Sequence, residues 1–319
     1  MILKTLPGTD LKVSQLCLGT NRFGTSTPEQ EAFALLDTFY EQGGNFLDTA
    51  LVYANWLPDV PESASEKTIG SWLRSRELTG RIVVATKGGH PDLATPQVSR
   101  LSAKDLAGDI EKSLSHLQVD AIDVFWLHRD NPEVPVADIL GALNQAVEGG
   151  YIRYFGPSNW HAPRIREALE YARRHGLKGF VANQPMWSLA AVNEGSVDAN
   201  LVVFDDDALA LHRESGLAVI PYSAQAQGFF SKLTASQEIP EGVRQRYMND
   251  LNLKRSSRLE ELAQRYSIPS AHIVLSYLTS QSIPVVPVVG CRTLAQLSES
   301  MAAVHMTLTS DELEYLQAK

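Results

Sequence analysis

The sequence predicts a (β/α)8 barrel formed by one domain over residues 1–319, and three observations lead to that prediction. Eight short apolar runs alternate with longer stretches of helical periodicity, which is typical of a parallel sheet covered by helices. Eight such units are the number that closes this sheet into a barrel. No run is followed by the Gly-x-Gly-x-x-Gly turn that marks an open dinucleotide-binding sheet.

The chain opens with a predicted hairpin, whose arms at 2–6 and 11–14 flank the turn Pro7-Gly8-Thr9-Asp10 and which we expect to close the bottom of the barrel. The expected barrel strands are residues 16–19, 45–49, 82–87, 122–128, 154–158, 180–184, 218–223 and 284–289. The expected helices are residues 28–42, 65–76, 102–116, 136–148, 162–175, 205–214 and 256–281, the last broken at Pro269, followed by a helix that Thr309 or Ser310 caps and that ends at Gln317.

The composition disfavours several classes of partner. A formal net charge of -9 argues against nucleic acid, because phosphate binding needs a basic face. No apolar run approaches the roughly 20 residues that span a bilayer, and the start Met1-Ile2-Leu3-Lys4 lacks the apolar segment of a secretory signal. Cys17 and Cys291 form neither a disulfide framework nor a zinc motif, which fits a reducing compartment. We therefore expect a cytoplasmic monomer or homo-oligomer that binds a small molecule and neither nucleic acid nor membrane.

Two long connections, at residues 53–62 and 224–250, follow predicted strands. Connections this long inside a compact domain are usually functional loops. Both should lie at the C-terminal ends of the strands, where the βα loops of a barrel build the active site.

Polar side chains end three consecutive predicted strands. Asp48 ends the second strand with Tyr53 just beyond it, Lys87 ends the third and His128 the fourth. Taken singly, each of the charged groups has a structural interpretation: a helix cap for Asp48, a solvated loop entry for Lys87 and a satisfied core residue for His128. Four such groups on one rim favour a catalytic site.

These four residues suit proton delivery to a carbonyl oxygen. A phenol with an ordinary pKa near 10 is a protonated acid at neutral pH, and we expect the ammonium of Lys87 to draw the pKa of Tyr53 toward the working range. Asp48 supplies the counter-charge that a buried lysine needs. His128 can hydrogen-bond the carbonyl and stabilise the negative charge that develops on it.

The same residues resemble the aldo-keto reductase family. The segments Phe46-Leu47-Asp48-Thr49-Ala50 with Tyr53, Ala85-Thr86-Lys87 and Trp126-Leu127-His128 are similar to that family's tetrad of Asp, Tyr, Lys and His, and the resemblance runs from Leu18-Gly19-Thr20 to Gln296-Leu297. It implies NAD(P)H-dependent reduction of an aldehyde or ketone to an alcohol, or the reverse oxidation, with the tetrad as the catalytic residues.

The resemblance also implies a nicotinamide cofactor site at the strand ends. Ser158, Asn159 and Gln184 should hold the carboxamide, because a primary amide needs both donors and acceptors. Tyr222 should stack on the ring, and a rim aromatic packed into the core is the alternative for it. The other implied cofactor residues are Gly19, Thr20, Asn21 and Asp48 near the first strands, Ser223, Gln225, Gly228 and Lys232 around the pyrophosphate, and Gly290, Arg292, Gln296, Glu299 and Ser300 at the adenosine end.

Arg292 beside a helix N-terminus is a suitable seat for a 2′-phosphate, which favours NADP(H) over NAD(H). Many members of the family have a lysine where this chain has Gly290 and an asparagine where it has Ser300. Both departures weaken the phosphate and adenine contacts that the resemblance implies.

The substrate residues are expected in the loops around the rim: Arg22, Phe23, Trp56, Trp126, Trp160 and Trp187. Aromatic surfaces with polar tips suit a sugar, a polyol, a glycoside or an aromatic aldehyde, whereas ordinary loop packing explains any single tryptophan equally well. The acidic loop residues Asp59 and Glu62 favour hydroxyl-bearing substrates over anionic ones.

Two other functions fit parts of the pattern. A regulatory subunit of the family would bind the cofactor and a partner protein, with slow or incidental catalysis, but the intact tetrad argues against regulation alone. A metal-dependent lyase or isomerase needs clustered His, Asp and Glu ligands at the strand ends. Only Asp48 and His128 qualify, with Lys87 between them in strand order, so we expect no metal.

Overall fold

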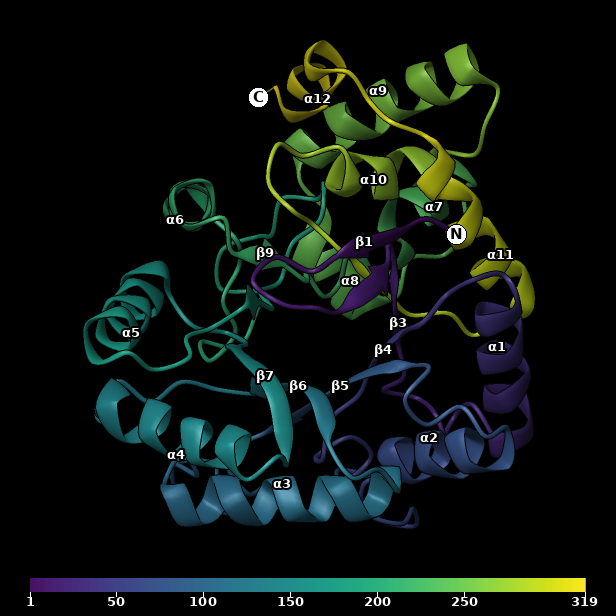
Figure 1. The fold of residues 1–319 in the computed structure, drawn as a ribbon. Coiled ribbons are helices and arrows are strands. Elements are labelled where there is room, and N and C mark those ends of the chain that lie inside the picture. Colours follow the sequence, from purple (N-terminus) through teal and green to yellow (C-terminus); the bar gives the residue numbers. More distant parts are fainter. Residues whose placement is uncertain (319) are drawn as a thin grey trace.

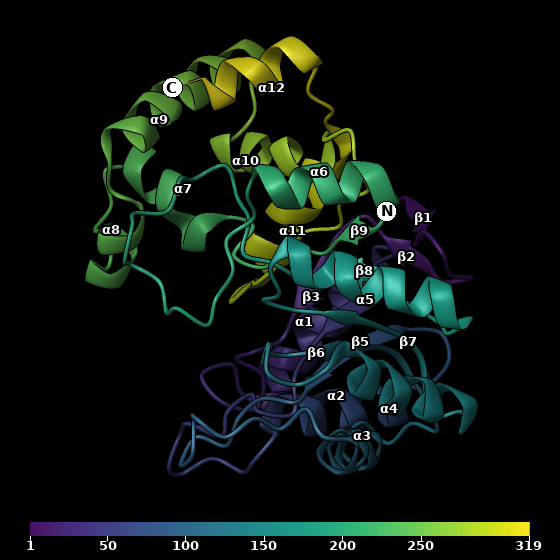
Figure 2. The ribbon, with the colours of Figure 1, turned by 90° about the vertical axis from the view of Figure 1, so that its left-hand side faces the viewer.

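A short hairpin opens the chain in the computed structural model, which describes residues 1–318 of the 319. Strands β1 (Leu3–Thr5) and β2 (Lys12–Ser14) pair antiparallel, with Leu3 opposite Ser14. The hairpin lies across one end of the barrel (Figures 1 and 2), and the side chains of Leu6 and Leu11 at its turn are buried. The prediction that it closes the bottom of the barrel is confirmed.

Eight parallel strands form the barrel. Six of them make one sheet in the order β10-β3-β4-β5-β6-β7, and two make a second sheet, β8-β9. Single parallel bridges, Ser158 to Gln184 and Val219 to Val285, join the two sheets and close the ring, which confirms the predicted fold. The strands are β3 (Cys17–Gly19), β4 (Phe46–Asp48), β5 (Val83–Gly88), β6 (Ile122–Leu127), β7 (Ile152–Pro157), β8 (Ala182–Asn183), β9 (Ala218–Val219) and β10 (Val288–Val289).

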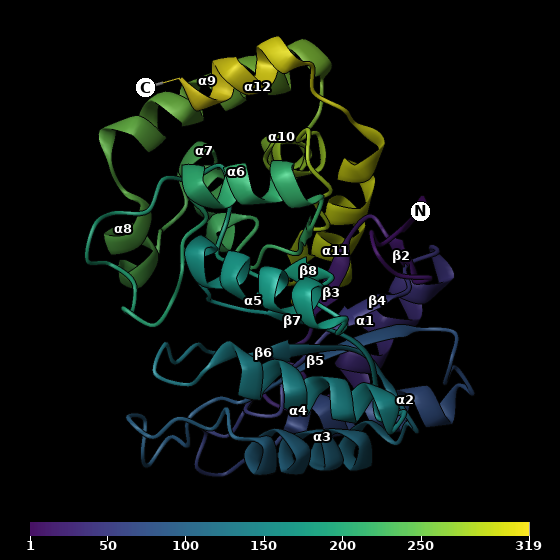
Figure 3. The same cartoon turned by 60° about the vertical axis from the view of Figure 1, so that its left-hand side comes forward.

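Helices surround these strands (Figures 1 and 3). Two more helices, α9 (Asp250–Tyr266) and α12 (Ser310–Gln317), pack on each other outside the ring, and a 3₁₀ turn, η2 (Ala303–His305), precedes α12. The ring helices are α1 (Glu29–Glu41), α2 (Ala64–Ser75), α3 (Ala103–Leu117), α4 (Val136–Glu148), α5 (Ala162–His175), α6 (Asp206–Ser215), α10 (Ser270–Thr279) and α11 (Leu294–Ala302).

Local sequence signals fix where these helices begin and end. The side chains of Ser102 and Asp205 accept hydrogen bonds from the third residue of α3 and α6, and Thr309 forms a full capping box with Glu312 at α12. The helices α4 and α5 have the predicted bounds, and Pro269 separates α9 from α10 as predicted.

The connection at 224–250 is more ordered than the sequence indicates. It contains the turn η1 (Ala226–Gly228) and the helices α7 (Phe229–Thr234) and α8 (Glu241–Tyr247), and α9 begins at its end. The side chains of Phe229, Phe230 and Tyr247 are fully buried, which anchors the short helices. Figure 2 shows α7 and α8 at the end of the barrel opposite the hairpin, where the C-terminal ends of the strands lie.

Two apolar cores hold the fold together. One fills the barrel and includes Phe46, Val124 and Trp126, and the larger one lies between the strands and the surrounding helices. Both cysteines are free and buried. Within residues 1–318, no helix has the length and apolarity that crossing a membrane requires.

Candidate active site

Lys87 is the centre of the tetrad, at the C-terminal end of β5. Its ammonium donates to Asp48 Oδ2 at 2.6 Å, to the carbonyl of Thr49 at 2.7 Å and to the hydroxyl of Tyr53 at 3.0 Å. The side chain is 2% exposed. An ammonium has three N–H groups, so each has a partner and the buried charge is fully compensated.

Asp48 ends β4 and holds the lysine from one side. Its second oxygen, Oδ1, accepts from Nε2 of Gln184 at 2.8 Å, and its side chain is 4% exposed. Burial lowers the pKa of Lys87, but the charge of Asp48 and the hydrogen bonds to Asp48 and Tyr53 outweigh it and the net shift is upward. The ammonium of Lys87 therefore stays charged at neutral pH.

Tyr53 is the phenol of the tetrad, and its pKa differs from the expectation. Burial raises its pKa above the ordinary value of 10, and the opposing charge of Lys87 does not overcome this. Lys87 lowers the pKa of Tyr53, as predicted, but burial acts more strongly, so the expectation that the pKa moves toward neutrality is corrected. The physical reason is that the lysine's charge is already balanced by Asp48, while the desolvation of a tyrosinate is not. Tyr53 remains a protonated acid.

His128 follows β6 and faces Tyr53, with ring centroids 6.0 Å apart. Burial lowers its pKa well below 6.5, and the cations Arg129 and Lys87 add to the shift, so the imidazole is neutral. Its Nδ1 is buried and has no hydrogen-bond partner among the described residues. A neutral ring of this kind can donate one hydrogen bond to a carbonyl without carrying a charge.

The residues predicted for the carboxamide meet at the bridge between β7 and β8. Ser158 Oγ donates to the carbonyl of Gln184 at 2.9 Å, and Tyr222 donates to Asn159 Oδ1 at 2.6 Å. Asn159 and Ser223 have positive φ angles of 63° and 55°. Such conformations cost free energy in residues other than glycine and concentrate at functional sites.

The cations Arg22, Lys232 and Arg292 come from three distant segments of the sequence but lie near one another in the structure. The charge of Arg292 lowers the pKa of both Arg22 and Lys232, after the larger effect of burial. Lys232 Nζ donates to the carbonyl of Gln227 at 2.8 Å, and a side chain at Gly228, where φ is +76°, would approach that Nζ to 2.6 Å. Mutually repelling cations of this kind suit the phosphates of a dinucleotide.

The predicted adenosine end lies at the start of α11. Thr293 caps this helix by accepting from the backbone N–H of Gln296 at 3.2 Å, and Gln296 Oε1 accepts from the N–H of Arg292 at 2.9 Å. Ser300 is buried and accepts from Gln225 Nε2 at 3.4 Å, which links α11 to the loop after β9. Gly290, Arg292 and Glu299 are exposed beside them.

The residues after β3 have structural contacts of their own. The hydroxyl of Thr20 is buried and donates to the carbonyl of Asp48 at 2.9 Å, so it faces the protein. A Cβ at Gly19 would approach Val288 Cγ1 to 2.8 Å, which explains the glycine without a ligand. Asn21 is exposed, two residues after the end of β3.

Three of the predicted substrate residues do not line an open pocket. Phe23, Trp126 and Trp160 are at most 1% exposed, so the expectation that they contact substrate is corrected. Trp126 is paired in register with Lys87 and packs inside the barrel, and Trp160 packs edge-on against Phe180 in the outer core. Trp56 does lie at the rim: it is 51% exposed and meets the Tyr53 ring edge-on at 6.2 Å.

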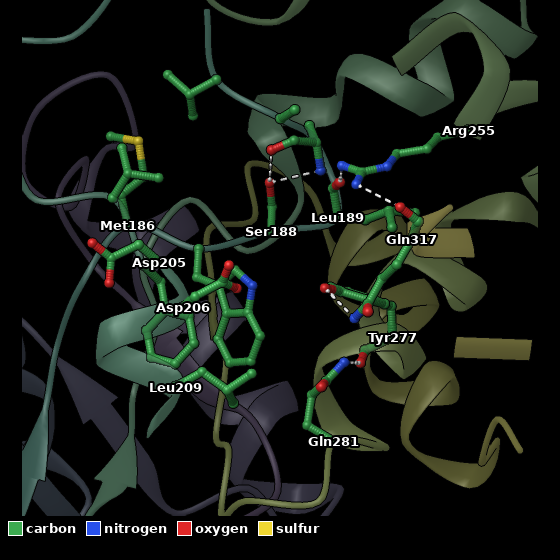
Figure 4. A pocket seen from close by; sticks show the side chains of 16 residues that line it. Met186, Ser188, Leu189, Asp205, Asp206, Leu209, Arg255, Tyr277, Gln281 and Gln317 are labelled. Atoms are coloured by element: carbon green, nitrogen blue, oxygen red, sulfur yellow. Dashed lines mark hydrogen bonds between the residues drawn. The ribbon is translucent and has the colours of Figure 1, made fainter. Parts of the chain in front are cut away.

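Trp187 lines a different cavity, of about 380 Å³, between the segment after β8, the start of α6 and the helices α9 and α10 (Figure 4). Its ring stacks on Phe204 at 4.1 Å. Arg255 closes one side through the carbonyls of Leu189 and Gln317. None of the tetrad residues lines this cavity, so the structure does not place Trp187 beside the carbonyl site.

Two site residues were missed in the sequence. His90 packs against His128 with ring centroids 4.9 Å apart, and Arg129 donates to the carbonyl of His128 at 2.8 Å. Both lie just after predicted catalytic residues at strand ends. His90 follows Lys87-Gly88-Gly89, and Arg129 follows His128. Their proximity in sequence to the tetrad was the available signal.

Comparison with known proteins agrees with this geometry. A model of the Aldo/keto reductase family matches residues 15–319. Norsolorinic acid reductase B of Dothistroma septosporum is 30% identical over 98% of this chain and 79% of its own. Norsolorinic acid reductase stcV of Emericella nidulans is 31% identical over the same shares, 98% and 79%. The putative aryl-alcohol dehydrogenase AAD14 of Saccharomyces cerevisiae is 29% identical over 97% of this chain and 83% of its own.

A solved structure shows the same fold. It is that of the thermostable aldo-keto reductase Tm1743, in complex with the inhibitor epalrestat. It superposes with a TM-score of 0.73 at 23% sequence identity, over 100% of this chain and 99% of the other.

Proposed function

Because the chain belongs to the aldo-keto reductase family, it is an oxidoreductase that reduces a carbonyl to an alcohol, and we propose that it uses NADPH and an aromatic aldehyde or ketone. The observation that supports the catalytic assignment is the buried ammonium of Lys87, which contacts both Asp48 and the hydroxyl of Tyr53. Such a linked acid at the C-terminal rim of a barrel is suited to proton transfer.

In this proposal, Tyr53 gives its proton to the carbonyl oxygen, and the adjacent Lys87 stabilises the resulting tyrosinate. His128 donates a hydrogen bond to the same oxygen and orients it. Asp48 holds the lysine in place and keeps it charged. A bound reduced nicotinamide supplies the hydride that the carbonyl carbon accepts.

The described residues fit such a cofactor. The amides of Asn159 and Gln184 and the hydroxyl of Ser158 provide donors and acceptors for the carboxamide, and Tyr222 beside them offers a ring for stacking. At the other end, Arg22, Lys232 and Arg292 would hold the phosphates. Gly19, Thr20 and Asn21 would contribute through backbone groups, and Ser223, Gln225, Gly228, Gly290, Gln296, Glu299 and Ser300 would surround the pyrophosphate and adenosine.

Two observations favour an aromatic substrate over the sugar or polyol. Trp56 presents a half-exposed ring next to Tyr53, against which an aromatic substrate can stack. The similar proteins above include norsolorinic acid reductases and an aryl-alcohol dehydrogenase by name. The regulatory alternative receives no support from those relatives. The proposal includes a cytoplasmic location, because both cysteines are free, as is usual in a reducing compartment.

The test measures the rate at which the protein reduces a panel of carbonyl compounds with NADPH. The loss of absorbance of the reduced nicotinamide gives that rate. We expect benzaldehyde and its ring-substituted derivatives to show a higher kcat/KM than aldoses such as xylose. Preference for the aldose would contradict the aromatic substrate. Tight binding of NADPH without turnover of any carbonyl would contradict the reductase and favour regulation.

The cofactor preference has its own test at Gly290. A Cβ at this exposed position meets no atom within 4 Å, so a lysine fits without displacing a neighbour. We expect Gly290→Lys to tighten NADPH binding by about two- to fivefold, as for an exposed ion pair, and to leave NADH binding unchanged. Titration by quenching of tryptophan fluorescence measures both, and Gly290→Gln controls for bulk. An equal gain for NADH would contradict a 2′-phosphate seat beside Arg292.

A further inference from the structure

A guanidinium without an acidic partner lies beside the tetrad. Arg129 Nη1 donates to the carbonyl of His128 at 2.8 Å, and Asn159 Nδ2 donates to that carbonyl at 3.3 Å. The group thus lies where the tetrad adjoins the proposed carboxamide site. Burial lowers the pKa of Arg129, and the hydroxyls of Tyr222 and Tyr53 oppose that shift. Both hydroxyls are therefore within its electrostatic reach.

The nearby carboxylates are engaged with other groups. Asp130, the next residue, pairs with Arg164 at 3.5 Å between Oδ1 and Nε. Asp198 is exposed and accepts from the backbone N–H of Asn200 at 2.9 Å. In residues 1–318, no carboxylate oxygen lies within 4.0 Å of the Arg129 guanidinium. A partly buried cation with unused donors is costly unless an anion binds it.

Apart from the exposed Asp198, the titratable groups around Arg129 carry no net charge. Burial lowers the pKa of His90 and of His128, and the charge of Arg129 adds to both shifts, so both rings are neutral. Lys87 is balanced by Asp48 at 2.6 Å, and Tyr53 is protonated. Among the described residues, Arg129 is thus a positive charge on the tetrad side of the site that has no paired carboxylate.

This cation is separate from the phosphate cations. The charge of Arg292 acts on both Arg22 and Lys232, whereas the groups that act on Arg129 are Tyr222, Tyr53 and Asp198. Its partner would therefore be on the substrate and not on the cofactor.

We propose that Arg129 forms an anion subsite, so that the preferred substrates are aromatic carbonyl compounds that carry a carboxylate. This inference rests on the proposed carbonyl reduction. A guanidinium binds a carboxylate through two parallel N–H groups and so fixes its orientation as well as its position, which would hold the carbonyl toward Tyr53. The acids Asp59 and Glu62 do not oppose it, because both are exposed and screened by solvent.

The kinetic test compares each formylbenzoate isomer with its uncharged methyl ester. In the wild type, we expect at least one acid to exceed its ester in kcat/KM. Arg129→Met should lower kcat/KM for that acid by about 10- to 100-fold, the usual loss for a hydrogen bond to a charged group, chiefly through KM, and leave the ester within about threefold. Arg129→Lys should retain part of the preference. Arg213→Met, which removes an exposed charge on α6, should preserve it.

A binding test separates this inference from the reductase function. The protein loaded with NADPH is titrated with benzoate and with benzamide by calorimetry, which needs no turnover. We expect benzoate to bind more tightly to the wild type, and Arg129→Met to remove that advantage. Equal binding of the two ligands, or benzoate binding that Arg129→Met leaves unchanged, overturns the subsite even if aldehydes are reduced. Benzoate selectivity that depends on Arg129 without any aldehyde turnover upholds the subsite and overturns the reductase.

Discussion

Tyr53→Phe should lower kcat for carbonyl reduction by about 10²- to 10⁴-fold, the usual contribution of a positioned general acid, and leave NADPH binding unchanged. Phenylalanine keeps the ring that packs edge-on against Trp56 at 6.2 Å and His128 at 6.0 Å. Only the hydroxyl is lost, to which Lys87 donates at 3.0 Å. Single-turnover rates and fluorescence titration measure the two quantities.

The control is Tyr151→Phe, because Tyr151 is 54% exposed and belongs to a turn before β7. It should have the wild-type rate. A wild-type rate in Tyr53→Phe as well would show that another group is the acid.

The rate of the wild-type enzyme should not change with pH between about pH 7 and 9. Tyr53 loses its proton only as the pH rises through a pKa raised above 10. His128 gains a proton only as the pH falls through a pKa lowered well below 6.5.

Lys87→Met should abolish most activity and also destabilise the protein by about 3–5 kcal/mol, because it leaves a buried carboxylate without its cation. Asp48 is 3% exposed and would retain only the hydrogen bond from Gln184. Urea unfolding gives the change in the free energy of unfolding, and turnover with a good aldehyde gives the activity.

Two variants make this prediction specific. Adding Asp48→Asn to Lys87→Met removes the unpaired charge, so stability should recover in part while activity stays low. Arg76→Met breaks an exposed pair with Asp37, 2.9 Å apart, and should cost at most about 1 kcal/mol. If Lys87→Met were no less stable than Arg76→Met, the buried pair would not have the energetic role assigned to it.

The tetrad could be predicted because its residues interrupt apolar strands. Asp48 and Lys87 each end a buried run, and parallel strands bring their C-terminal ends to one rim. Their contact at 2.6 Å follows from that topology. The pKa of Tyr53 could not be predicted, because it depends on how deeply the phenol is buried and on whether the lysine is already neutralised.

The aromatic residues show where sequence reasoning fails. Trp126 lies in a run of buried residues on β6, and only its register with Lys87 and its packing in the barrel core show that it points into the barrel. Trp160 is next to a predicted site residue, yet its ring turns outward to Phe180. In the connection at 224–250, the helices α7 and α8 have 6 and 7 residues, which is too short for a clear helical period, so the sequence does not predict them.

The bridge between Ser158 and Gln184 has two roles. It is one of the two single bridges that close the barrel, and its residues are those proposed to hold the nicotinamide carboxamide. The hydrogen bond from Gln184 to Asp48 also links this bridge to the tetrad. A substitution that changes these proposed ring contacts would therefore also change the seam of the sheet, whereas the start of α11 is exposed and can change without that effect. Changes of cofactor should accordingly arise at the adenosine end, with the hydride-bearing end held constant by the architecture itself.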